Sequence, residues 1–214
     1  MTKKSAFSKK EEALHAATHG LGAVLGLVGL VFLVVLASKQ GDVWRIVSFS
    51  IYGTTLFLLY LASTLYHSIT HPKAKHVFRI LDHCSIYFLI AGTYTPFSLV
   101  TLRGPWGWSF FAVVWSLALL GVIFKIFFIH RFNTLSTLIY VAMGWLILIG
   151  GKTVLAQSPP AALKWLLAGG IFYTIGAVAF LLNRIRYHHV VWHLFVMSGS
   201  LCHFGAILFH VLPR

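Results

Sequence analysis

Long apolar runs separated by short polar breaks dominate the chain. Each run is close to the ~20 residues that an α-helix needs to cross a bilayer. The apolar character is continuous rather than alternating, which favours spanning helices over barrel strands. Pro72 and Pro105 fall in two of the breaks, and Pro159-Pro160 marks a third. Seven runs are predicted, at about 19–38, 44–67, 80–101, 107–129, 134–151, 162–182 and 190–211.

Composition agrees with this pattern. Of the 214 residues, 58% are hydrophobic and only 10% are charged, far below the roughly 25% charged residues of soluble domains. We therefore expect an all-α integral membrane protein, a bundle of seven transmembrane helices. Cys84 and Cys202 lie inside apolar runs, which argues against a disulfide framework.

The first run follows several lysines but is too long for a cleaved signal peptide, and no convincing cleavage site follows it. We interpret it as a retained helix. Residues 1–17 are predicted to form a short basic cytoplasmic tail, and residues 18–214 a single seven-helix domain. Gly22 and Gly26, four residues apart on the first run, permit close contact with another helix.

The cations are distributed unevenly between the two sides of the predicted bundle. The richer side holds Lys3, Lys4, Lys9, Lys10, Lys73, Lys75, Arg79, Lys125, Arg131, Arg184 and Arg186. The positive-inside rule therefore predicts a cytoplasmic N-terminus and a C-terminus outside. The net charge of +13 is explained by juxtamembrane cations attracted to anionic lipid headgroups at the cytoplasmic face. Nothing in the sequence suggests nucleic acid binding.

Histidines provide the candidate metal site. His189 and His193 open the last run and, four residues apart on a helix, lie about 6 Å apart on one face. His67 ends the second run, and with seven spans that end lies on the same side as the start of the seventh. Three imidazoles can hold zinc and leave a fourth position open for water, as in catalytic zinc sites. Alternatively, each histidine is an interhelical hydrogen-bond donor.

Of only four acidic residues, Asp82 alone lies at the edge of a spanning run away from the tail and the first loop. An acid at this depth is a functional candidate with an expected partner. Asp82 is predicted to be the general base for zinc-bound water, and Ser63, one turn before His67, to hydrogen-bond the water or a substrate carbonyl. A simple ion pair between Asp82 and Arg79 is the alternative.

Two further histidine-bearing segments were considered. Glu12, His15 and His19 share one helical face before the first run; we expect them to cap the helix, with an outer shell around the metal site as the alternative. His203 lies about 15 Å deeper than His193 by helical rise, too far to share the ion. A buried hydrogen bond is the expected role of His203, with a polar lining of the cavity as the alternative.

Several motifs stand out along the chain. They are Ser63-Thr64-Leu65-Tyr66-His67, Leu81-Asp82-His83-Cys84, Ala91-Gly92-Thr93-Tyr94-Thr95-Pro96-Phe97, His189-Val190-Val191-Trp192-His193 and Cys202-His203-Phe204. Together these motifs resemble the hemolysin III family, the bacterial members of the progestin and adiponectin receptor superfamily. His15 stands where members usually carry Asn. The resemblance implies seven helices with the N-terminus inside, and zinc held by His67, His189 and His193 with Asp82 and Ser63 beside the bound water. It also implies a multi-pass protein of the bacterial inner membrane.

The leading functional hypothesis is a zinc-dependent hydrolase of lipid amide or ester bonds, similar to ceramidases, acting on membrane lipids in lipid homeostasis. A non-catalytic sensor or receptor with structural zinc is the first alternative. A pore or hemolysin-type protein that perturbs membranes is the second. The sequence predicts no particular substrate and no protein partner.

Overall fold

The structure, a computed structural model, describes residues 7–129, 131–182 and 187–213. Within these ranges the chain is helical and contains no strand. The seven predicted spans and the all-α fold class are confirmed. The side of the membrane that each terminus faces stays a prediction. It rests in part on four cations that lie outside the described ranges, Lys3, Lys4, Arg184 and Arg186. The spans are Lys9–Gln40, Val43–Ser68, Pro72–Thr101, Pro105–Phe128, Asn133–Gln157, Pro160–Leu181 and His188–Val211.

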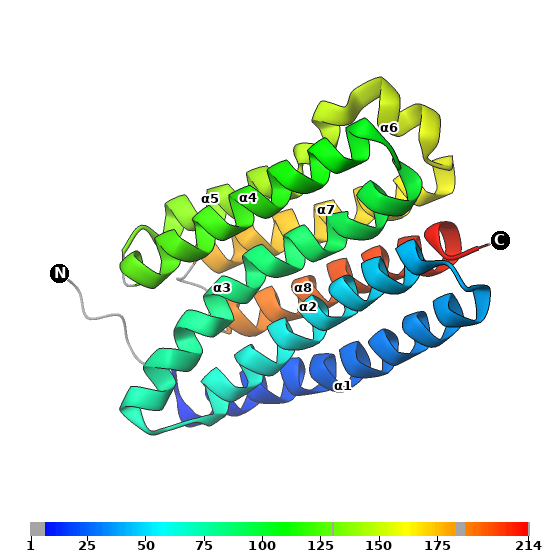
Figure 1. The fold of residues 1–214 in the computed structure, drawn as a ribbon. Helices are drawn as coiled ribbons and strands as arrows, with labels where there is room; N and C mark the ends of the chain where they lie inside the picture. Colours follow the sequence, from blue (N-terminus) through cyan, green and yellow to red (C-terminus); the bar gives the residue numbers. More distant parts are fainter. Residues whose placement is uncertain (1–6, 130, 183–186, 214) are drawn as a thin grey trace.

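The spans form an antiparallel bundle in which α1 and α2 pack along each other, as do α7 and α8 (Figure 1). One end of the bundle gathers the start of α1, the end of α2 and the starts of α3 and α8. The elements are α1 (Lys9–Gln40), α2 (Val43–Ser68), α3 (Pro72–Pro96), η1 (Phe97–Thr101), α4 (Pro105–Phe128), α5 (Asn133–Gly144), η2 (Leu146–Gly150), α6 (Gly151–Gln157), α7 (Pro160–Leu181), α8 (His188–Ala206) and η3 (Ile207–Val211).

Helix ends follow from local chemistry rather than from hydropathy. Ser8 caps α1 in a capping box with Glu11, so α1 begins at Lys9 and its first turns occupy most of the predicted tail. Pro72 begins α3 because a first-turn proline sacrifices no helical hydrogen bond. The two helices thus begin about two to three turns before their apolar runs, and this extension makes the first turns of α1 and α3 part of the bundle.

Glycines let α1 approach α2 closely, as their spacing predicts. A Cβ atom on Gly22 would lie 2.7 Å from the ring of Tyr60, and one on Gly26 would lie 3.4 Å from the backbone of Phe57. Close approach of helix axes replaces the hydrophobic driving force that is missing in lipid. The pairing fixes the position of the start of α1 relative to the end of α2.

The outer surface of the bundle is apolar, with side chains such as Val24, Leu120 and Leu201 more than 60% exposed. Such a surface suits lipid rather than water. Inside, one buried cluster is built from α1, α2 and α8 with parts of α3 and η1, and another from α3, α4 and α5. A cavity of about 550 Å³ adjoins both clusters, and it reaches the bundle end at which the histidines gather.

Candidate metal centre

Four imidazole rings from three helices meet at this end of the bundle. His15 comes from α1, His67 from the end of α2, and His189 and His193 from the start of α8. Their ring centroids lie between 4.5 and 5.4 Å apart in every pairing. His15, His67 and His193 are buried, and His189 is partly buried. The structure therefore brings the three predicted histidines together and adds a fourth.

The tightest group differs from the predicted one in a single residue. One ligand nitrogen from each of His15, His67 and His189 lies within 4.8 Å of the other two. His193 is the neighbour of His189 in the same cluster, at 4.7 Å between ring centroids. Among the described residues, both nitrogens of His15 and His189 and the Nε2 atom of His67 are buried without a hydrogen-bond partner. Buried polar atoms normally have partners, so these nitrogens fit a metal ion.

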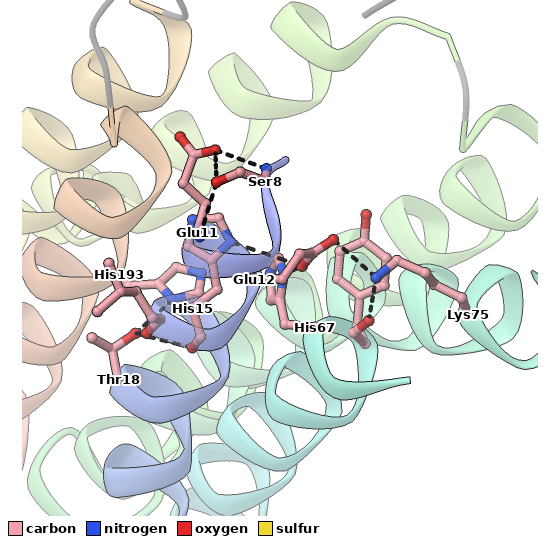
Figure 2. A network of polar contacts seen from close by, with 10 residues as sticks. Ser8, Glu11, Glu12, His15, Thr18, His67, Lys75 and His193 are labelled. Carbon is pink, nitrogen blue, oxygen red and sulfur yellow. Dashed lines mark hydrogen bonds and ion pairs between the residues drawn. The ribbon is translucent and has the colours of Figure 1, made fainter. Parts of the chain in front are cut away.

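Glu12 orients the ring of His67 (Figure 2). The Glu12 carboxylate accepts a hydrogen bond of 2.6 Å from Nδ1 of His67. Lys75 donates to the other carboxylate oxygen at 3.0 Å and to the backbone oxygen of Tyr66 at 3.1 Å. With Nδ1 as the donor, Nε2 of His67 carries the lone pair. This is the carboxylate–histidine arrangement that orients metal-binding imidazoles in proteins.

Thr18 orients the ring of His193, as Glu12 orients that of His67. The Thr18 hydroxyl donates to the backbone oxygen of Leu14 at 2.8 Å, and its oxygen lies 3.1 Å from Nδ1 of His193. The hydroxyl proton has two backbone acceptors, the oxygens of Leu14 and His15; with the proton on either of them, Nδ1 of His193 donates to Thr18 and Nε2 carries the lone pair. The ring of His193 also stacks on that of His19, at 3.5 Å between centroids and 9° between planes.

Asp82 and Ser63 lie at the same end of the bundle. Asp82 lines the cavity together with His189 and His193. The Ser63 side chain is buried in α2 and lies close to the Asp82 carboxyl; it is not part of the cavity lining, so it reaches the cavity only through Asp82. Arg79, the alternative partner of Asp82, also acts on that carboxyl electrostatically.

The cavity is largely apolar beyond this polar end. Its lining includes Leu148, Leu155 and Leu167, which are each more than half exposed on the lipid-facing surface. His203 lines it as well, with Nε2 3.4 Å from the backbone oxygen of Leu166, which confirms the expected buried hydrogen bond. Lys125, counted above among the cytoplasmic cations, is 1% exposed and lines the cavity, so it does not face headgroups.

Sequence reasoning missed three residues of this centre. His15 was expected in a helix cap, whereas Ser8 and Glu11 supply the cap and leave His15, Glu12 and Thr18 facing the cluster. The signal was present in their spacing, because residues three and four apart share a helix face. The outer-shell alternative named Glu12, His15 and His19, and the structure favours it for Glu12; the contact of Thr18 with His193 was not predicted.

Comparison with known proteins agrees with these features. The family profile described as Haemolysin-III related matches residues 7–204. The chain is 51% identical over 213 residues to Hemolysin-3 of Bacillus cereus, covering 100% of this chain and 97% of that protein. It is 48% identical over 204 residues to the Hemolysin-3 homolog of Bacillus subtilis, covering 95% and 96%. Human monocyte to macrophage differentiation factor is 29% identical over 203 residues, covering 92% and 83%. The chain therefore belongs to the hemolysin III family of the progestin and adiponectin receptor superfamily.

Proposed function

We propose that the protein is a zinc-dependent hydrolase of acyl-lipid amide or ester bonds, acting in membrane-lipid homeostasis in the bacterial inner membrane. The observation that carries the proposal is the position of the imidazole cluster and Asp82 at the polar end of an apolar cavity within the bundle. A soluble substrate would not need such a cavity, whereas a lipid would fill it with its acyl chain.

His67, His189 and His193 would hold the metal. Two of these rings are already held in the tautomer that presents Nε2, by Glu12 and Thr18. When bound by three histidines, zinc lowers the pKa of a coordinated water to about 7 and polarises a carbonyl group. Within the described ranges, Nε2 of His67 and both nitrogens of His189 are buried without a hydrogen-bond partner, which fits their role as ligands.

Asp82 would act as the general base. Its carboxyl borders the cavity beside the cluster, where it would take a proton from the attacking water and return it to the leaving amine or alcohol. Ser63 would hold the Asp82 carboxyl in position, since its side chain lies beside that carboxyl and outside the cavity lining. Ser63 is therefore a positioning residue in this mechanism.

The apolar cavity would bind the acyl chain. A volume of about 550 Å³ is within the range of small-ligand sites, roughly 300–1,000 Å³. The exposed leucines in its lining, Leu148, Leu155 and Leu167, are on η2, α6 and α7 and would let a chain enter sideways from the lipid phase. The scissile bond would then lie at the polar end, near Asp82.

Metal analysis paired with lipid mass spectrometry tests this proposal. Purified wild-type protein should contain one zinc per chain and release fatty acid from an acyl-lipid panel. The Asp82→Asn variant should retain zinc and lose fatty-acid release, while Asp42→Asn, which alters a helix cap at the other end of α2, should keep both. Metal-loaded wild type without turnover on amide and ester lipids would contradict the proposal.

A sensor with structural zinc is the second candidate, and the fourth imidazole in the cluster favours it because structural zinc sites are closed by four protein ligands. In a sensor, Asp82→Asn would leave function intact, whereas His193→Ala would lower stability and function together. The Bacillus cereus relative is named Hemolysin-3. A membrane-perturbing activity of this chain would be measured as dye release from lipid vesicles.

A further inference from the structure

The proposed function leaves His15 without a role. Its side chain is fully buried in the second turn of α1, and neither ring nitrogen has a hydrogen-bond partner among the described residues. The nearest carboxylate oxygen, Oε2 of Glu12, is 4.0 Å away and already accepts from His67. An enclosed imidazole without a partner costs free energy, so a ligand for His15 is the simplest explanation of its position.

The neighbours of His15 indicate which ligand this is. Its ring is 4.5 Å from that of His67 and 4.7 Å from that of His189, and these three residues form the tightest set of possible metal ligands. Phe7 packs edge-on against His15 at 4.7 Å and also borders His189 at 5.2 Å. The ring of His15 is thereby held inside the cluster.

His19, the other buried histidine of α1, does not fit the same role. Its ring lies parallel to that of His193 at 3.5 Å. An imidazole lone pair lies in the plane of its ring, so two parallel stacked rings cannot direct their lone pairs at one ion. His19 therefore serves as a matched control for His15, one helical turn away on the same face of α1.

We propose that His15 is a fourth imidazole ligand of the metal held by His67, His189 and His193. The inference rests on the metal-binding part of the proposed function and adds a ligand from α1. Four protein ligands close a tetrahedral zinc site, so the resting centre has no position free for water or substrate.

His15 is also the ligand best suited to leave. His67 is anchored by Glu12 and His193 by Thr18, and outer-shell partners of this kind fix ring orientation and strengthen binding. Neither His15 nor His189 has such an anchor among the described residues, but His189 lies on α8 together with the anchored His193, whereas His15 is the one ligand of the four that comes from α1. Displacement of His15 would open the fourth position for water, which makes His15 a switch between a closed and a reactive centre.

Cobalt substitution and X-ray absorption test this inference on the full-length protein in detergent. Wild-type protein loaded with Co²⁺ should show four imidazoles around the metal. His15→Asn should show three imidazoles and one oxygen ligand, and azide should change its visible spectrum at a concentration more than about tenfold lower than in wild type. His19→Asn should keep four imidazoles and the azide response of wild type.

The number of imidazoles around the metal in wild-type protein tests the role of His15 even if a variant fails to fold. Three imidazoles plus oxygen in wild type, or equal counts in wild type and His15→Asn, would overturn the role of His15 and leave the proposed hydrolase intact. Protein that binds neither zinc nor cobalt would overturn both this inference and the metal site of the proposed function.

Discussion

Glu12 offers the sharpest test of the metal centre, because it contacts the site only through another residue. Its carboxylate accepts a 2.6 Å hydrogen bond from His67 and pairs with Lys75 at 3.0 Å. Glu12→Gln keeps the shape of the side chain and an acceptor oxygen but removes the charge. Lys75 keeps its hydrogen bond to Tyr66, so the substitution acts mainly on His67.

The magnitude follows from the type of hydrogen bond. A bond to a charged group contributes about 1.5–3 kcal/mol and a neutral one about 0.5–1.5 kcal/mol. The difference of about 1 kcal/mol or slightly more weakens zinc binding by about tenfold. Glu12→Ala, which removes the acceptor altogether, should weaken it by up to about 100-fold.

Competition with a chromophoric chelator measures these affinities in detergent. Glu11→Gln is the matched control, because Glu11 is the adjacent acid and its side chain contacts Ser8 in the helix cap. It should alter helix stability slightly and leave zinc affinity unchanged. Equal zinc affinities for wild type, Glu12→Gln and Glu12→Ala would refute the role assigned to Glu12 and, with it, the orientation argument for His67.

Two further predictions follow from the same geometry. Thr18→Val keeps the side-chain shape but removes the acceptor for Nδ1 of His193. Because an unsatisfied buried donor costs about 1–3 kcal/mol, the zinc affinity measured by chelator competition should fall by about tenfold or more. Thr64→Val is the control for this variant, because the Thr64 hydroxyl donates to the backbone oxygen of Tyr60 at 2.7 Å. Thr64→Val should leave the zinc affinity unchanged. Equal losses of zinc affinity in both variants would indicate a general packing effect. Metal removal should lower the melting temperature, because a ligand at a free concentration of 1,000 times its dissociation constant stabilises the folded state by about 4 kcal/mol. The same melting temperature with and without chelator would mean that the metal does not link α2 to α8.

Much of the architecture could be predicted from hydropathy alone. Seven apolar runs yield seven spans because each run must satisfy its backbone hydrogen bonds within a helix in lipid. The convergence of His67 with His189 and His193 also followed, because the four spans between the second and the seventh, an even number, return the chain to the side on which the second span ends. The residues at which helices begin were harder to predict from hydropathy. The start of α1 at Lys9 depends on the Ser8 cap, and the start of α3 depends on Pro72.

Which side chains face the cavity and which face their neighbouring helices depends on the direction in which each side chain points. Lys125 was counted with Arg131 among the cations at the cytoplasmic side of the fourth and fifth spans, yet the rotation of α4 buries it in the cavity lining. The hydrogen bond predicted from Ser63 to the water or a substrate carbonyl stays a prediction, and the structure adds that the Ser63 side chain is buried close to the Asp82 carboxyl. Neither outcome is visible in a sequence, because the rotation of a helix about its axis is set by what packs around it.

The sequence by itself determined the class of protein, the number of spans and the depth of the histidines, because these depend on how apolar each segment is and on counting. Only the tertiary structure decided that His15 joins the cluster, that Glu12 and Thr18 contact the rings of His67 and His193, and that Asp82, His189 and His193 line one cavity. Those features require atoms from α1, α2 and α8 to approach within a few ångströms. The close packing of α1 on α2 at Gly22 and Gly26 is the physical reason that they do.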